Sequence, residues 1–166
     1  MANKSKTVAF VGACTALALI LAYVEALLPP LFPAVPGMKM GLPNIVIVFL
    51  LYRRGPIFAG TVSLLRILLV SLLFGNVMAL LYSLAGGALS LLVMALLRRL
   101  RVLSTVGVSV AGGVSHNIGQ ILMAMLVLET AELGYYLAVL TVTGTVAGIL
   151  IGLCGALLIK HIPKKL

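Results

Sequence analysis

A short polar stretch interrupts an apolar run in the second half of the chain, which reads AGGVSHNIGQIL at residues 111–122. His116 and Gln120 are four residues apart, so they share one face of a helix, and Asn117 lies beside them. The glycines of this stretch leave room next to the polar groups for a ligand or for a neighbouring helix. The pattern favours a ligand pocket with convergent donors and acceptors, and the alternative is a hydrogen-bond network that only holds helices together.

Arg66 is the second candidate, because it lies in the middle of an otherwise apolar run. It follows the start of that run at residue 56 by about 15 Å of helical rise, which puts its guanidinium near the midplane of a membrane. Ionisable groups at that depth cost about 2.5–3.5 kcal/mol on insertion scales and mark functional sites by default. A planar guanidinium suits a carboxylate or a phosphate, so we expect a ligand with an anionic group.

Further polar residues complete the predicted substrate site. Asn44 begins the second apolar run and Lys39 lies just before it, so an amide would bind the polar edge of the ligand and the lysine would favour its negative charge. Glu25 lies near the outer end of the first run, where a hydrated carboxylate is the alternative to a binding role. The predicted substrate-binding residues are Lys39, Asn44, Arg66, His116, Asn117, Gln120 and Glu25.

These residues are positioned by apolar runs, most of which are long enough to cross a membrane. Of the 166 residues, 63% are hydrophobic and only 9% are charged, which is more apolar surface than a soluble domain can cover. A helix needs about 20 apolar residues to cross hydrocarbon about 30 Å thick. The second run reaches only about 18 Å, so it is either tilted or part of a broken segment. We expect spans at residues 7–28, 41–52, 56–74, 76–97, 106–128 and 135–159.

The positive charges indicate the topology of these six spans. Ten of the twelve Lys and Arg residues fall before span one or after spans two, four and six. By the positive-inside rule this side is cytoplasmic, so both termini are expected there. We therefore predict an all-α integral protein of the cell (plasma) membrane, with a cytoplasmic tail at 1–6 and a single six-helix transmembrane domain at 7–166. The net charge of +9 is thus a topology signal, and no basic patch interleaved with aromatic residues points to nucleic acid.

Two stripes of small residues predict close helix contacts. Small residues at four-residue spacing let helix backbones approach each other in a membrane. For the glycine stripe we expect contacts within the chain, whereas the alanine stripe suits either the chain's own helices or a partner protein. The alanine stripe consists of Ala18, Ala22 and Ala26, and the glycine stripe of Gly144, Gly148 and Gly152.

The connection at residues 29–40 is apolar and contains four prolines. Prolines exclude a regular helix, and irregular backbone near a membrane must be buried in protein or line a cavity. We expect this segment to lie as a lid over an outward-facing site, and a compact connector is the alternative.

Several absences exclude enzymatic chemistry. The chain contains no aspartate, so it lacks the Asp-rich clusters that hold magnesium and diphosphate during prenyl transfer. It also lacks the phosphate-binding loop G-x-x-x-x-G-K-[ST] and the hydrolase motifs H-E-x-x-H and G-x-S-x-G. We therefore expect no catalytic residue, no metal site and no bound cofactor, and we predict that the chain is not an enzyme.

Two stretches resemble a known family. The sequences AYVEALLPPLFPAVPGMKMGLPN at 22–44 and GGVSHNIGQ at 112–120 resemble the Gx transporter family, also called heptaprenyl diphosphate synthase component I, over about residues 7–160. That family is similar to the S components of energy-coupling-factor transporters. The resemblance implies a six-helix bundle, an outer loop at 29–43 that covers the substrate, and docking of a transmembrane coupling subunit, driven by two ATPases, on the alanine stripe. The synthase name implies a link to the isoprenoid tail of menaquinone.

The sequence therefore predicts a membrane-embedded substrate-binding subunit of an ATP-driven importer for a small vitamin or cofactor precursor. Its expected partners are an anionic small molecule, the lipid bilayer, a coupling subunit and ATPases. The alternative is a non-catalytic membrane subunit that assists heptaprenyl diphosphate synthase in menaquinone side-chain biosynthesis. A solitary facilitator without any ATPase is a third possibility.

Overall fold

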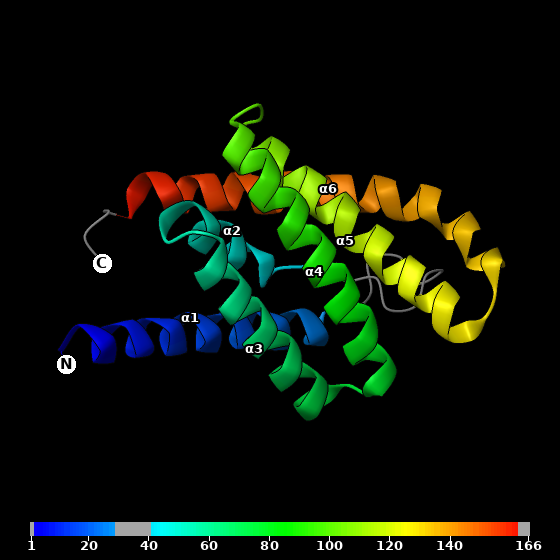
Figure 1. The fold of residues 1–166 in the computed structure, drawn as a ribbon, viewed down its shortest axis with the longest axis horizontal. Coiled ribbons are helices and arrows are strands. Elements are labelled where there is room, and N and C mark those ends of the chain that lie inside the picture. Colours follow the sequence, from blue (N-terminus) through cyan, green and yellow to red (C-terminus); the bar gives the residue numbers. More distant parts are fainter. Residues whose placement is uncertain (1, 29–40, 163–166) are drawn as a thin grey trace.

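The computed structural model of the protein is an all-helical bundle and describes residues 2–28 and 41–162 (Figure 1). Within these ranges the chain forms six α-helices and one short 3-10 helix. The elements are α1 (Ala2–Leu27), α2 (Asn44–Arg53), α3 (Pro56–Phe74), α4 (Val77–Leu100), α5 (Thr105–Leu128), η1 (Ala131–Tyr136) and α6 (Leu137–His161).

Five segments of the described chain are long and apolar enough to cross a membrane: α1, α3, α4, α5 and the continuous segment of η1 and α6. These spans identify a multi-pass membrane protein. Helix α2 has 10 residues and therefore rises only about 15 Å, about half of the hydrocarbon thickness. The expected count of six spans is thus not confirmed, because the second run forms a helix of only 10 residues and five segments are long and apolar enough to span.

The helix ends follow local sequence signals. Gly55, with φ of 99°, separates α2 from α3, and Pro56 occupies the first turn of α3, where its missing N–H costs no hydrogen bond. The side chain of Asn76 caps α4 by accepting a 2.8 Å hydrogen bond from the backbone N–H of Ala79. The breaks expected at residues 55–56 and 75–76 are confirmed.

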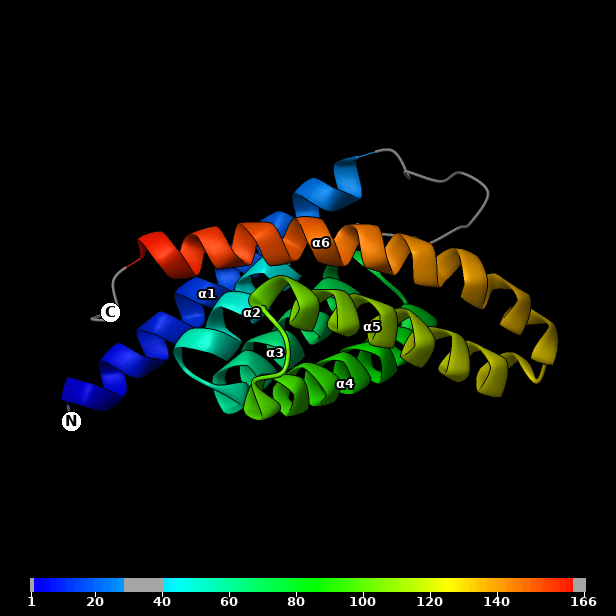
Figure 2. The same ribbon diagram turned by 90° about the horizontal axis from the view of Figure 1, so that it is seen from above.

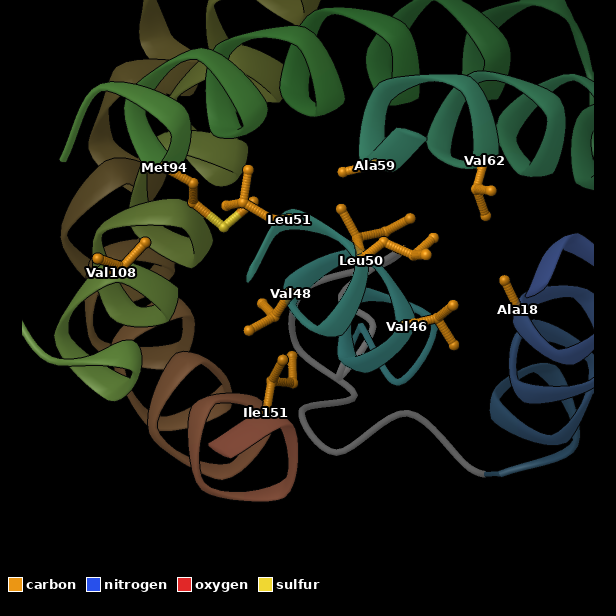
Figure 3. Close-up of a cluster of buried hydrophobic side chains, with 11 residues drawn as sticks. Ala18, Val46, Val48, Leu50, Leu51, Ala59, Val62, Met94, Val108 and Ile151 are labelled. Carbon is orange, nitrogen blue, oxygen red and sulfur yellow. The ribbon is translucent and has the colours of Figure 1, made fainter. Parts of the chain in front are cut away.

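Helix α2 lies inside the bundle, where α1, α3 and α6 contact it (Figures 1 and 2). No residue of α2 is exposed, and its buried side chains form the centre of the hydrophobic core. The core also takes one or two side chains from each of the surrounding α-helices (Figure 3). Its buried members are Ala18, Val46, Ile47, Val48, Leu50, Leu51, Ala59, Val62, Met94, Val108 and Ile151.

The glycine stripe of α6 packs against α5. A Cβ at Gly148 would lie 2.6 Å from the Cα of Val110, and a Cβ at Gly152 would lie 2.7 Å from the Cα of Val106. Real side chains do not tolerate such contacts with backbone, so only glycine allows these two helices to come so close. The expectation that the glycine stripe makes contacts within the chain is confirmed.

Two of the three residues of the alanine stripe of α1 are also buried by other parts of the chain. Ala18 is 0% exposed and Ala22 is 8% exposed, whereas Ala26 is exposed. Ala18 belongs to the hydrophobic core, next to the α2 side chains (Figure 3). Ala18 and Ala22 are therefore covered by the chain's own side chains in this conformation, and the docking role expected for the stripe stays a prediction.

Three arginines gather at one end of the bundle, which we call the arginine end (Arg53, Arg54 and Arg98). The Arg53 guanidinium donates to the backbone carbonyls of Ile159 and Ile162 where α6 ends. Arg54 lies 4.8 Å from the ring centroid of Phe10 near the start of α1, and Arg98 lies 5.5 Å from that of Tyr52. The ends of α2, α4 and α6 therefore share one side of the bundle with the start of α1.

Candidate functional site

The polar residues of α2 and α3 lie directly beyond the hydrophobic core, on its side away from the arginine end. Val46 of α2 and Val62 of α3 are both core residues (Figure 3). Asn44 precedes Val46 by about 3 Å of helical rise, and α2 runs toward the arginine end. Arg66 follows Val62 by about 6 Å, and α3 runs away from that end. Both residues therefore lie on the same side of the core.

Glu25 joins the end of α1 to the start of α2. Its side chain is only 8% exposed, and its Oε1 accepts a hydrogen bond from the backbone N–H of Gly41. The Gly41 carbonyl in turn accepts a 2.8 Å bond from the backbone N–H of Asn44. Glu25 also interacts electrostatically with Arg66. The carboxylate is therefore part of the same polar region as Asn44 and Arg66.

His116 and Gln120 reach this region from α5, next to Gly86 of α4. A Cβ at Gly86 would lie 2.7 Å from the backbone oxygen of His116 and 2.8 Å from the Cγ of Gln120. Gly119 of α5 makes a similarly close contact, because a Cβ there would lie 2.8 Å from the backbone oxygen of Ala85 in α4. The two helix backbones thus approach each other closely where the imidazole and the amide lie. As predicted from their spacing, His116 and Gln120 share one face of α5.

Arg66 connects the α3 side of the region with the α5 side. Helix α3 meets α4 at Gly87, where a Cβ would lie 2.9 Å from the Cδ1 of Ile67 and 3.8 Å from the Oγ of Ser63. Gly87 is the neighbour of the glycine that contacts His116, and Arg66 interacts electrostatically with that histidine. The Nε of Arg66 is buried and has no hydrogen-bond partner within residues 2–28 and 41–162. A buried donor without a partner is costly, so this group is available for a ligand.

We call Glu25, Asn44, Arg66, His116 and Gln120 the polar layer, because they lie together beyond the core. Four helices contribute to it, namely α1, α2, α3 and α5. It contains one carboxylate, one guanidinium, one imidazole and two amides, which can accept and donate hydrogen bonds. The arrangement suits the binding of a polar group at membrane depth.

One of the predicted site residues, Asn117, is not part of the polar layer. The side-chain amide of Asn117 donates a 2.6 Å hydrogen bond to the carbonyl of Leu140 and so joins α5 to α6. This is the interhelical bond that the alternative interpretation of the stretch at 111–122 expects for this residue. Lys39 lies outside the described residues, as does the expected lid at 29–40.

Ser63 was not predicted from the sequence, although it lies one turn before Arg66 and is buried. Serines in membrane helices often bond to the backbone of their own helix, so residue type alone does not single this one out. The signal that could have found it is its position three residues before an intramembrane arginine, on the same helix face.

The described residues contain no group of three His, Cys, Asp or Glu side chains that could hold a metal ion.

A family model described as heptaprenyl diphosphate synthase component I matches residues 14–158. It is the family that the stretches at 22–44 and 112–120 predict, and the match covers most of the chain. The comparison with curated proteins and the comparison with solved structures gave no match.

Proposed function

Since the chain belongs to the heptaprenyl diphosphate synthase component I family, we propose that it is a membrane-embedded subunit that binds a small vitamin or cofactor precursor for an ATP-driven importer. It would act in the plasma membrane and would resemble the S component of an energy-coupling-factor transporter. The observation that carries this proposal is the polar layer beyond the hydrophobic core, in which the buried Nε of Arg66 has no hydrogen-bond partner among the described residues.

The position of α2 supports an anionic ligand. This helix begins within the bundle at Asn44, and the N-terminal end of a helix carries a partial positive charge. Short helices that begin inside a membrane protein present this end to anionic substrate groups in several transporter folds. Together with the guanidinium of Arg66, the start of α2 would attract a carboxylate or a phosphate to the polar layer.

The core separates the proposed site from the arginine end. Five of the eight side chains of α2 between Asn44 and Arg53 are buried. A ligand in the polar layer would therefore enter from the opposite side, and its release past the core would require the helices to rearrange. A partner that binds one conformation more tightly than the other, and that uses ATP, would supply this change.

A docking surface for such a partner is available on the outer face of α1. Ala9, Gly12, Ala13 and Ala16 are all exposed, and a Cβ at Gly12 would meet no heavy atom within 4 Å. Small residues on a helix face let a second helix approach closely. We therefore assign docking to this face and to Ala26, in place of the buried Ala18 and Ala22.

The experiment that tests the binding role is mass spectrometry of small molecules retained by the purified protein. The wild type should retain a compound that Arg66→Gln and Gln120→Ala lose. Arg99→Gln, which removes an exposed arginine at the end of α4, is the matched control and should retain the compound. If both site variants retained it as well as the wild type, the polar layer would not be the binding site.

Co-purification in mild detergent tests the partner. A transmembrane coupling subunit and two ATPases should accompany the chain, and Gly12→Leu should weaken this association while ligand retention survives. If Gly12→Leu kept its partner proteins but lost the ligand, docking on α1 would be contradicted.

A second function is favoured by the family description, which names a component of a prenyl diphosphate synthase. In that case the chain would be a non-catalytic membrane subunit that assists a soluble synthase in menaquinone side-chain biosynthesis. The same co-purification would then recover the synthase in place of the ATPases. Activity of that synthase would rise when the chain, reconstituted in lipid, is added.

A further inference from the structure

The arginine end carries positive charge that no acidic side chain offsets. The sequence contains only three acidic residues, and all of them lie elsewhere. Glu25 follows Lys6 of α1 by about 28 Å of helical rise, and Glu129 follows the start of α5 by about 36 Å. Glu132 comes next along the chain, in η1. Exposed charges more than about 8 Å apart are largely screened at physiological ionic strength, so these carboxylates do not neutralise the arginine end. The exposed cations at and around this end are Lys4, Lys6, Arg54, Arg99, Arg101 and Lys160.

The last turns of α4 place exposed leucines directly before one of these cations. Leu92, Leu96 and Arg99 follow one another by four and three residues, so they share one face of the helix. Both leucines are more than half exposed, and Arg99 is exposed as well. We call these three residues the α4 stripe. Arg98, the neighbour of Arg99, donates a 3.4 Å hydrogen bond to the carbonyl of Tyr52, so a second guanidinium lies near the end of this stripe.

The last turns of α6 repeat this pattern with the same spacing. Leu153 and Leu157 precede Lys160 on one face of the helix, and we call these three residues the α6 stripe. Both leucines are at least half exposed, and the lysine is exposed. The carbonyls at the C-terminal end of a helix carry a partial negative charge, which repels an anion. Arg53 donates to two of these carbonyls at the end of α6, so a guanidinium again accompanies the cation of the stripe.

Each stripe matches the shape and the charge of a phospholipid. Helices α4 and α6 are both long and apolar enough to cross a membrane, so their last turns approach a membrane surface. We propose that the arginine end binds anionic phospholipids, one along the α4 stripe and one along the α6 stripe. The acyl chains lie along the exposed leucines, and the phosphate lies at the cations of the last turn.

The two parts of each stripe decide the class of ligand. A soluble phosphate would contact the cations but would leave the leucines beside them uncovered, whereas a lipid covers both. An anionic headgroup is favoured over a zwitterionic one, because only the former brings a net negative charge to the arginine end. Neither stripe includes a residue of the polar layer, so this inference goes beyond the proposed function and does not depend on it.

The experiment is native mass spectrometry of the full chain in detergent, titrated with phosphatidylglycerol or with phosphatidylcholine that has the same acyl chains. The wild type should bind phosphatidylglycerol more tightly. Arg99→Gln/Lys160→Gln should bind it about fivefold more weakly than the wild type, because one cation near an anionic membrane surface contributes about that factor. Binding of phosphatidylcholine should not change. Lys160→Glu alone, with the same expected direction, replaces the double variant if the latter is not monodisperse.

Glu129→Gln/Glu132→Gln is the matched control, because it changes two exposed charges away from the arginine end. It should bind phosphatidylglycerol as the wild type does. A variant at the two stripes that bound phosphatidylglycerol as tightly as the wild type would overturn the inference, and so would a wild type without preference between the two lipids.

Glycerol 3-phosphate, which has a phosphate but no acyl chain, tests the alternative source of the anion. At millimolar concentration it should leave bound phosphatidylglycerol in place. If it displaced the lipid while sodium chloride of equal ionic strength did not, the arginine end would be a site for a soluble phosphate, and the lipid inference would be wrong. The proposed small-molecule binding is judged separately, by the compound that Arg66→Gln loses.

Discussion

The contact of α4 with α5 at Gly86 allows a quantitative prediction for Gly86→Ala. The new Cβ would lie 2.7 Å from the backbone oxygen of His116, and ordinary contact begins at 3.4 Å, so the helices must separate by about 3.4 − 2.7 = 0.7 Å. Helix α5 cannot move toward α6 to make this room. A Cβ at Gly113, on its other side, would already lie 2.6 Å from the carbonyl oxygen of Gly144.

Helix α4 must therefore shift away from α5, and overpacking of this kind costs about 1–3 kcal/mol. For a chain of this size we expect the midpoint of thermal unfolding to fall by about 2–12 °C. The shift also moves His116 and Gln120 away from Arg66, so retention of the native ligand should fall in parallel. The chain has no Trp, so circular dichroism in detergent is the suitable measurement.

Gly12→Ala is the matched control, because it is the same substitution in a membrane helix where a Cβ meets no heavy atom within 4 Å. It should leave the unfolding midpoint within about 2 °C of the wild type. An unfolding midpoint of Gly86→Ala equal to that of Gly12→Ala would refute the argument that α5 is tightly held between α4 and α6.

Three further predictions follow from individual contacts. Asn117→Ala removes the 2.6 Å bond to the carbonyl of Leu140 and should lower stability by about 0.6–1.7 kcal/mol without changing ligand retention; unchanged stability in detergent unfolding would contradict the interhelical role. Ala18→Leu should overpack the core by about 1–3 kcal/mol, whereas Ala26→Leu, on an exposed position, should be neutral; equal unfolding midpoints would show that α1 is oriented differently. Arg53→Gln should free the carbonyls at the end of α6 and speed amide hydrogen exchange in its last turn, and protection as in the wild type would argue against this contact.

Most of the helix positions could be predicted from the sequence, because their signals are local. The pair Gly55 and Pro56 can end one helix and begin the next without any tertiary help. The shared face of His116 and Gln120 follows from helix geometry alone. These predictions depend on the spacing of neighbouring residues, which a single helix fixes.

The relations between helices could not be predicted, because tilt and rotation depend on packing. Depth along the chain separates Glu25 from Arg66 by about 12 Å, and the tilt of their helices decides how far apart the two side chains lie. The partner of His116 is Gly86, and nothing in the stretch around this glycine distinguishes it from Gly87 beside it. The inward rotation that buries Ala18 is likewise set by the core side chains of α2.

The short helix α2 has a consequence for how the protein is made. It is too short to be inserted as a span by its own apolar length, and each of its residues is at least partly buried by the other helices. One of these helices is α6, where a Cβ at Gly155 would lie 2.9 Å from the Cγ1 of Val48. Because α6 leaves the ribosome only after α3, α4 and α5, α2 reaches its final surroundings long after its own synthesis. Until then, a chaperone, the insertion machinery or lipid must cover the side of α2 that α6 later occupies.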